Sequence, residues 1–337
     1  MKFDVMRLHV PEEDREIRQC LRAYTILPKY CETPDEKNEK AKEILESVWK
    51  IRDKLRAKHG RKWGYAWMEK IPYGATYSVV KDWMIGRASI PLIAIDSLRE
   101  LGFEKETAEI LENVEYVSST TGDITKIPKG IDKDLAYLTG LILGDGSLPI
   151  KHESGGRNHR LIITSGDKKL IEKVALLIER IFEVTLGDAH YYSRKSGSSW
   201  NLYKGNKAIY RFFSKIVCLT NGNKAKNGKI PHTIKPLPDA EKVAFIAGLI
   251  DSDIGRHGRG MGCTFKSKKL VEDLLIFLGI LGIEAKAYGS HYKDNKYLQH
   301  DFTIPKSQIK RLKELLVENY LPLKEDRLNT INMLTQG

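Results

Sequence analysis

LAYLTGLILGDGSL at Leu135–Leu148 and VAFIAGLIDSDIG at Val243–Gly255 are the stretches that decide the fold of this chain of 337 residues. Both are mainly apolar, both hold small residues at a spacing of four, and both contain an aspartate near the end. A pattern that recurs within one chain is typical of a duplicated structural unit. We therefore expect two copies of one unit in the C-terminal two-thirds of the chain.

The residues after each stretch also repeat in the same order. A strand-like segment runs into an amphipathic helix at Arg160–Phe182 and Cys263–Ile283, and alternating segments follow at His190–Gly205 and Glu284–Ile304. Each copy closes with a helix, near residues 206–216 and 306–320. Because period-two alternation indicates strands and a period of 3.6 indicates helices, the predicted order is helix, strands, helix, strands, helix, twice over. The sequence thus predicts an α+β fold with two pseudo-symmetric units.

The opening stretches are expected to form two helices that pack against each other. Gly140 and Gly144 in the first, and Gly248 and Ser252 in the second, are small residues four apart on one face. Small residues at this spacing let two helix backbones approach closely. The neighbouring apolar residues would face the two flanking cores; these are Leu141, Ile142, Leu249 and Ile250.

Side-by-side packing of these helices would bring two carboxylates together, Asp145 and Asp253. Two like charges at the negative ends of two helix dipoles repel each other, and a divalent cation offsets that cost. Mg²⁺ suits carboxylate oxygens combined with water and phosphate oxygens. One such aspartate alone would be a capping or surface acid, but the matched pair indicates a metal site for phosphodiester hydrolysis.

These segments resemble the LAGLIDADG homing endonucleases from Ile131 to about Leu323, with LTGLILGDG and IAGLIDSDI matching the two signature motifs. The resemblance implies two αββαββα halves, with the motif helices at their interface and a saddle of antiparallel sheets over the DNA major groove. It implies that Asp145 and Asp253 bind Mg²⁺, with Mn²⁺ as a substitute, and that each acid cuts one strand. The function it implies is site-specific hydrolysis of double-stranded DNA at a long, asymmetric target site.

The resemblance also implies DNA contacts from basic and polar residues of the sheets. In the first half the candidates are Arg157, Arg160, Arg194, Lys195 and Lys204. In the second half they are Arg256, Arg259, Tyr288, His291, Lys293 and Lys296. Residue type does not separate contacts to bases from contacts to phosphates.

A basic residue often stands at the strand–helix junction near the active site of this family. Counting back from the first leucine of each following helix gives Gly166 in the first half and Lys266 in the second. Lys266 is therefore our third catalytic candidate, and the first half departs from the family pattern.

Two motif positions also differ between the copies. Ile254 stands where a glycine usually follows the acid, and Asp251 matches a position that Leu143 holds in the first copy. We assign Asp251 a packing or capping role. The departures at Gly166 and Ile254 leave open unequal cutting by the two halves, or binding without cutting.

The N-terminal part is expected to be a separate helical domain. Pro34–His59 has the apolar stripe of a long amphipathic helix, and Tyr73–Gly102 resembles the helix-turn-helix of phage-repressor-type DNA-binding domains. Within this segment, the second helix of the motif would span Tyr77–Ile85, and a further helix would begin after Pro91. The exposed DNA-contacting candidates are Tyr77, Ser78, Lys81 and Arg87. The alternative is a three-helix domain used only for packing.

The predicted domain order is a helical domain at 1–123 with its helix-turn-helix-like segment at about 65–110, a first half at 131–216, a linker at 217–242 and a second half at 243–325. The charge follows this division, because residues 1–123 carry 21 Lys and Arg against 22 Asp and Glu, and the rest carries 35 against 22. A basic region of this size suits a nucleic acid, although charge alone fits a merely soluble surface equally well.

Composition argues against several other classes. No apolar run approaches the ~20 residues of a membrane span, and the four cysteines form no C-x-x-C pair. We expect a cytoplasmic, nucleoid-associated protein that works as a monomer, since one chain holds both halves. Because Met1 and the final MLTQG differ from the ends of a splicing element, we expect a free-standing protein, encoded in an intron or as its own gene.

Two other functions remain open from the sequence. One is a sequence-specific DNA-binding regulator that has lost catalysis, which the departures at Gly166 and Ile254 favour and the two aspartates oppose. The other is an intron RNA maturase, because relatives in this family assist RNA splicing. No RNA-specific aromatic motif occurs in the chain.

Overall fold

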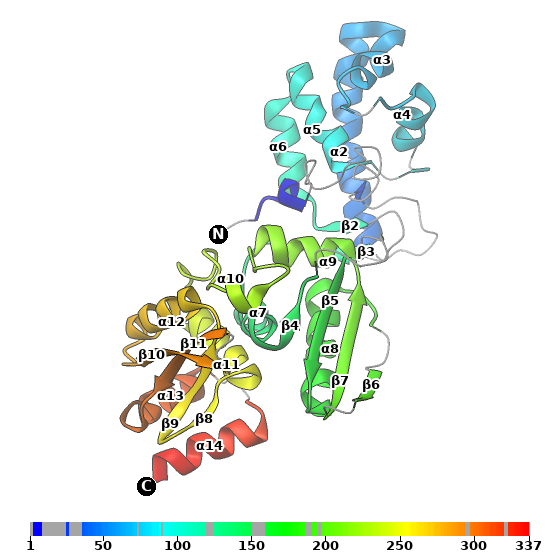
Figure 1. Ribbon diagram of the computed structural model, residues 1–337. Helices are drawn as coiled ribbons and strands as arrows, with labels where there is room; N and C mark the ends of the chain where they lie inside the picture. Colours follow the sequence, from blue (N-terminus) through cyan, green and yellow to red (C-terminus); the bar gives the residue numbers. More distant parts are fainter. Residues whose placement is uncertain are drawn as a thin grey trace. The chain divides into compact units, whose positions relative to one another are not determined.

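The two similar stretches form two neighbouring helices, α7 (Lys133–Asp145) and α11 (Asp239–Ser252), in the computed structural model of the protein (Figure 1). The structure describes residues 3–8, 25–26, 36–72, 74–85, 87–88, 90–118, 124–149, 159–186, 190–194, 197–293, 297–319 and 323–336. The chain divides into two units, one of 1–130 with 182–184 and 206–216, and one of the remaining residues.

The first unit is mainly helical, as expected. Its helices are η1 (Val5–Leu8), α2 (Glu36–His59), η3 (Gly60–Lys62), α3 (Trp63–Met68), α4 (Tyr77–Met84), α5 (Leu92–Asp96), η4 (Ser97–Leu101), α6 (Glu104–Asn113), α9 (Lys207–Arg211) and the π-helix η5 (Phe212–Ile216). A small antiparallel sheet, which the sequence analysis did not predict, joins β1 (Thr25–Ile26), β2 (Tyr116–Ser118) and β3 (Ile124–Lys126). The domain is therefore helical with a minor sheet, and not wholly α.

Two tryptophans form the centre of the helix-turn-helix-like segment. Trp67 of α3 and Trp83 of α4 are buried, and their rings lie 5.9 Å apart. The indole Nε1 of Trp67 donates to the carbonyl oxygen of Ala94 at 3.0 Å, which ties α3 to α5. Helix α4 ends one residue earlier than the predicted Ile85, and Pro91 precedes α5 as expected.

The second unit contains two halves with the same sheet topology. The first half has α7, β4 (Gly146–Ser147), β5 (Arg160–Ser165), α8 (Lys168–Phe182), β6 (His190–Arg194) and β7 (Gly197–Gly205). The second has α11, β8 (Gly255–His257), β9 (Gly260–Phe265), α12 (Lys268–Ile280), β10 (Lys286–Lys293), β11 (Tyr297–Ile304) and α13 (Lys306–Glu318). The sheet orders β4-β5-β7-β6 and β8-β9-β11-β10 confirm the predicted pseudo-symmetry.

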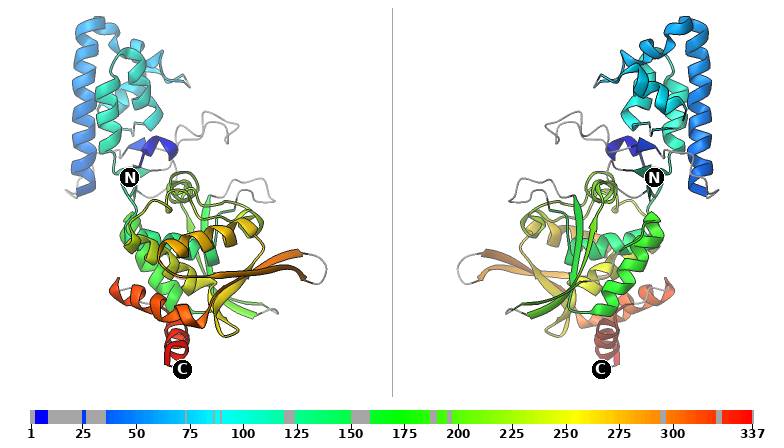
Figure 2. Two further views of the ribbon diagram at one scale, coloured as in Figure 1. Left: turned by 90° about the vertical axis from the view of Figure 1, so that its left-hand side faces the viewer. Right: turned by 90° about the vertical axis from the view of Figure 1, so that its right-hand side faces the viewer.

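The sheets are open and antiparallel, with neighbouring strands in regular register. Residues 160–165 of β5 pair with 200–205 of β7, and 261–265 of β9 pair with 300–304 of β11. The pair of β10 and β11 extends as a long ribbon, with a register shift between Tyr288 and His291 (Figure 2). Helix α12 packs against β9, β10 and β11. Apolar side chains of the strands and of α8 and α12 are buried and contribute to the core of each half.

Three features of the chain differ from the predicted domain boundaries. Residues 206–216, which we assigned to the first half, have their contacts with the N-terminal unit. The segment we took as an inter-half linker contains a short helix, α10 (Lys224–Asn227). A further helix, α14 (Glu325–Gln336), follows the predicted end of the second half. Among the described helices, none combines the length and apolar character that crossing a membrane requires.

Candidate active site at the ends of the paired helices

The small residues of α7 and α11 allow the two backbones to meet. A Cβ atom on Gly140 would clash with the carbonyl oxygen of Phe245, and one on Gly248 would clash with that of Tyr137. Near the C-terminal ends, a Cβ on Gly144 would clash with the hydroxyl of Ser252 and lie 3.2 Å from Oδ2 of Asp253. The structure therefore confirms the predicted close packing.

This packing brings Asp145 and Asp253 to one end of the helix pair. Asp145 is the last residue of α7 and is partly buried, whereas Asp253 directly follows α11 and is exposed. Burial, together with the charge of Asp253, raises the pKa of Asp145 to about 6. Burial of its carboxylate also raises the pKa of Asp253, although the residue as a whole is exposed. The raised pKa values show that the protein alone disfavours two negative charges here.

Lys224 of α10 caps the end of α7 beside these acids. Its Nζ donates to the carbonyl oxygen of Ile142 at 3.1 Å and to that of Gly144. Burial lowers the pKa of Lys224 to about 8, although the charges of Asp253 and Asp145 counteract that effect. A cation at this point satisfies the free carbonyl groups of the helix end and faces both carboxylates.

Arg327 of α14 caps the end of α11 in the corresponding way. Its Nε donates to the carbonyl oxygen of Ile250 at 2.9 Å, and its Nη2 lies 3.5 Å from that of Ser252. The positive charge of Arg327 lowers the pKa of both aspartates, against the larger effect of burial. Each motif helix thus ends at one acid and one capping cation.

The sequence analysis found the acids but missed Lys224 and Arg327. Lys224 lies in the segment that we assigned to a linker, and Arg327 lies beyond the predicted second half. Neither residue belongs to the repeated stretches. The available signal for Lys224 was the basic segment NGNKAKNGKIP at residues 221–231, which follows the first copy of the repeat.

The two carboxylates fit a divalent cation that keeps most of its coordination for water and substrate. Within the described part of the chain, no cluster of three or more His, Cys, Asp or Glu side chains could enclose a metal ion. Mg²⁺ needs no such cage, because it is usually held by one or two carboxylates together with water and phosphate oxygens. A donor set of carboxylate oxygens alone suits such a cation.

The other motif predictions are placed by the structure as follows. Lys266 lies between β9 and α12, at the expected junction, and Gly166 is exposed at the equivalent junction between β5 and α8. Ile254 is fully buried, so the side chain that replaces the usual glycine packs into the core. Asp251 is also fully buried and accepts hydrogen bonds, which fits the capping or packing role assigned to it.

The candidate DNA-contacting residues of the sheets lie on strands and turns. Arg160 begins β5, Lys204 lies on β7, Arg194 on β6, Arg256 on β8, and Tyr288, His291 and Lys293 on β10. Arg259 is exposed in the turn between β8 and β9, and Tyr288 is 54% exposed. The Nζ of Lys204 donates to the carbonyl oxygen of Thr185 at 2.7 Å. Arg157, Lys195 and Lys296 lie outside the described residues.

The N-terminal candidates are all exposed. Tyr77, Ser78 and Lys81 lie on the outer face of α4, and Arg87 follows that helix. The ring of Tyr77 stacks on Tyr65 of α3, with centroids 4.9 Å apart and planes inclined by 9°. These side chains are therefore accessible to solvent on one face of α4.

The raised pKa of Asp145 predicts that stability depends on pH. Its pKa is about 6 in the folded protein and near 4 in an unfolded chain, so ionisation destabilises the fold. This cost is absent below about pH 4 and develops as the pH rises through about 6. In metal-free buffer, Asp145→Asn should raise the melting temperature by about 5 °C at pH 8 and leave it unchanged at pH 4.

The matched control for this measurement is Asp239→Asn. The side chain of Asp239 is 70% exposed at the start of α11, where it forms an ion pair with Lys242. Its replacement should leave the melting temperature nearly unchanged at both pH values. Equal melting temperatures for Asp145→Asn and the native protein at pH 8 would contradict the assignment of a raised pKa.

Parts of this chain are similar to known proteins. The model of the LAGLIDADG-like domain family matches residues 132–217 and 240–316. The chain is 28% identical over 165 residues to the replication factor C small subunit of Methanocaldococcus jannaschii, a match that covers 47% of this chain and only 9% of that relative. It is 24% identical over 195 residues to the homing endonuclease I-DmoI of Desulfurococcus mucosus, covering 57% and 92%. The crystal structure of I-DmoI in complex with DNA and Ca aligns with a TM-score of 0.42 and 20% identity, over 58% of this chain and 96% of that one.

Proposed function

Because residues 132–217 and 240–316 make this chain a member of the LAGLIDADG-like domain family, we propose that it is a site-specific endonuclease for double-stranded DNA. The observation that carries the proposal is the pair of aspartates at the ends of two closely packed helices, each beside a capping cation. The 24% identity with the homing endonuclease I-DmoI, over nearly the whole of that protein, supports the same activity. The basic C-terminal two-thirds of the chain suits a polyanionic substrate.

In this proposal Asp145 and Asp253 hold a divalent cation, Mg²⁺ or Mn²⁺, between the helix ends. The chemistry supplied by such a cation is polarisation of the phosphodiester and a lowered pKa of bound water. The remaining oxygens of the two carboxylates would accept hydrogen bonds from the attacking water and so orient it. Burial raises the pKa of both acids, and the charge of Asp253 adds to the effect on Asp145, so a bound cation would offset both effects.

Lys224 and Arg327 would stabilise the negative charge that develops on the phosphate. Hydrolysis adds water across one phosphorus–oxygen bond, so the leaving oxygen of the DNA must gain a proton. With its pKa near 8, Lys224 can give up a proton close to neutral pH, whereas Arg327 acts through its fixed charge. Lys266 remains a third candidate from its place at the strand–helix junction.

The test of this function is cleavage of DNA by the purified full chain. The protein is incubated with a plasmid library of genomic or randomised duplex inserts, with Mg²⁺, with Mn²⁺ or with EDTA, and all new ends are sequenced. Discrete double-strand breaks that require the metal would establish the activity and its target. Tight, specific binding without breaks under any divalent metal would show a DNA-binding regulator, and preference for structured intron RNA over duplex DNA would show a maturase.

The N-terminal unit is proposed to add a second DNA contact through α4. Lys81→Ala should weaken binding to the target at low salt and reduce the slope of log affinity against log salt by about one, as expected for one lost phosphate contact. Lys70→Ala is the matched control, because Lys70 is an exposed lysine of the same unit that pairs with Glu100 outside α4. If both variants retain the native affinity and slope, this unit has no direct role in binding.

A further inference from the structure

Two buried aspartates outside the acid pair hold the chain segments that carry Lys224 and Arg327. Asp251 lies on α11 and is 0% exposed, and Asp273 lies on α12 and is 3% exposed. Each accepts a hydrogen bond from a backbone N–H of the segment on which a capping cation is mounted. Each also faces lysine side chains, so the buried charge is compensated.

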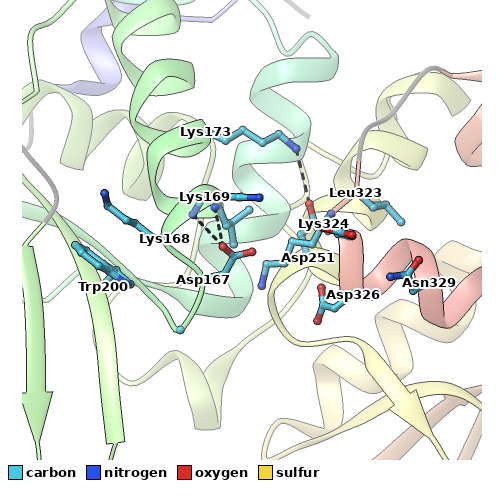
Figure 3. A pocket seen from close by; sticks show the side chains of 13 residues that line it. Asp167, Lys168, Lys169, Lys173, Trp200, Asp251, Leu323, Lys324, Asp326 and Asn329 are labelled. Atoms are coloured by element: carbon cyan, nitrogen blue, oxygen red, sulfur yellow. Dashed lines mark hydrogen bonds and ion pairs between the residues drawn. The ribbon is translucent and has the colours of Figure 1, made fainter.

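Asp251 holds the segment that begins α14. Its Oδ1 accepts from the backbone N–H of Lys324 at 2.8 Å, three residues before Arg327. Its Oδ2 accepts from the hydroxyl of Tyr137 on α7 at 2.6 Å and lies 3.8 Å from Nζ of Lys173 on α8 (Figure 3). Asp251, which holds this segment from α11, is itself contacted by two side chains of the first half.

Asp273 holds the segment that follows α10. Its Oδ2 accepts from the backbone N–H of Ile230 at 3.1 Å, and its Oδ1 accepts from Lys235 at 3.0 Å. The hydroxyl of Ser267, at the start of α12, donates to the carbonyl oxygen of Gly228 at 2.6 Å. The segment that places Lys224 at the end of the first-half helix is thus attached to the second half.

The two attachments have one feature in common, although their residues differ: each includes contacts between the two halves. The segment of Lys224 contacts the second half directly. The segment of Arg327 is held by Asp251 of its own half, and the carboxylate of Asp251 contacts Tyr137 and Lys173 of the first half. Taking a carboxylate out of water is costly, and an ion pair in the interior gives back little net stability. What a buried carboxylate does provide is a fixed acceptor for one backbone N–H, which sets the path of the segment.

We propose that Asp251 and Asp273 are positioning residues, each of which fixes the segment carrying one active-site cation and thereby governs cutting of one DNA strand. The inference rests on the proposed endonuclease function. Asp251 acts through Arg327 at the end of α11, and Asp273 acts through Lys224 at the end of α7. Since displacements of about 1 Å at a reacting group can cost on the order of a hundredfold in rate, loss of either attachment should be visible in kinetics.

The experiment measures cleavage of each strand of the target duplex separately, with the two strands carrying different end labels. Asp251→Ala and Asp273→Ala should each slow one strand, by about tenfold to a hundredfold, and the slowed strand should differ between them. Nicked DNA should accumulate in both cases, while affinity measured in EDTA stays native. Asp251→Asn and Asp273→Asn, which keep an acceptor oxygen, should show the same strand preference with a smaller loss.

Two further comparisons separate positioning from general stability. Glu272→Ala and Asp239→Ala are matched controls, because these exposed acids lie on α12 and α11 in lysine pairs and should leave both strands unaffected. Asp251→Ala should add little to the loss already caused by Arg327→Ala, and Asp273→Ala little to that of Lys224→Ala.

The outcomes distinguish this inference from the proposed function. A native protein that cuts neither strand would refute the endonuclease proposal. If the native protein cuts both strands, but the two aspartate variants slow them equally or their losses add fully to those of the cation variants, the positioning roles are refuted. If the alanine variants fail to fold, judged by melting and by DNA affinity, the asparagine variants decide by whether each slows a different strand.

Discussion

The double variant Asp145→Asn with Asp253→Asn is expected to lose double-strand cleavage by on the order of a thousandfold or more, while it keeps its affinity for the target. Asparagine has almost the same size and shape as aspartate, so the packing of α7 against α11 should survive. It cannot supply a negatively charged oxygen, so a divalent cation is no longer held. The measurement is target cleavage in Mg²⁺, paired with binding in EDTA.

The single variants sharpen this expectation. If each acid serves one strand, Asp145→Asn and Asp253→Asn should each yield nicked plasmid, with the nick in opposite strands. Asp239→Asn supplies a control on the same helix, since that acid is 70% exposed at the far end of α11. Linear product from the double variant at the native rate would remove the two acids from the mechanism.

The second large effect is expected at the helix interface. Gly248→Ala places a methyl group against the carbonyl oxygen of Tyr137, and Gly140→Ala places one against that of Phe245. Both neighbours are backbone atoms of a buried helix, so neither can rotate away. We expect each substitution to destabilise the second unit by more than about 3 kcal/mol, or to prevent its folding.

Gly279→Ala is the matched control for these substitutions. Gly279 also lies within a helix, α12, but a Cβ atom there meets nothing within 4 Å. Because alanine has the higher helix propensity, this change should stabilise the protein by up to about 1 kcal/mol. Thermal or denaturant unfolding of the three variants gives the comparison. A native midpoint for Gly248→Ala would mean that the helices do not approach as closely as the structure shows.

The N-terminal unit shows a limit of prediction from local patterns. The long helix and the segment around Trp67 and Trp83 were predictable, since helical periodicity and capping are read over a few residues. The small sheet was not, because β1 and β2 are short strands whose pairing joins residues more than 90 positions apart. Strand pairing over such a distance leaves no local pattern in the sequence.

For the second unit, the sequence alone determined the duplication, the two motif helices, their small interface residues and the two acids. These features are local. The spacing of Gly140 and Gly144, or of Gly248 and Ser252, indicates a contact face within a single helix, and each acid lies at the end of its own helix. The repeat then predicted that the two motif helices pack against each other, because each motif pairs with its copy.

Only the tertiary structure decided which cations accompany the acids. Lys224 reaches carbonyl groups 80 and 82 residues away, and Arg327 reaches carbonyl groups 75 and 77 residues away. Lys224 lies on a short helix between the two halves, and Arg327 lies on a helix beyond the predicted second half. Both are selected by the unsatisfied carbonyl groups that every helix end presents. Since any basic residue in a connecting segment could meet that need, the path of the chain, fixed in part by Asp251 and Asp273, determined which ones do.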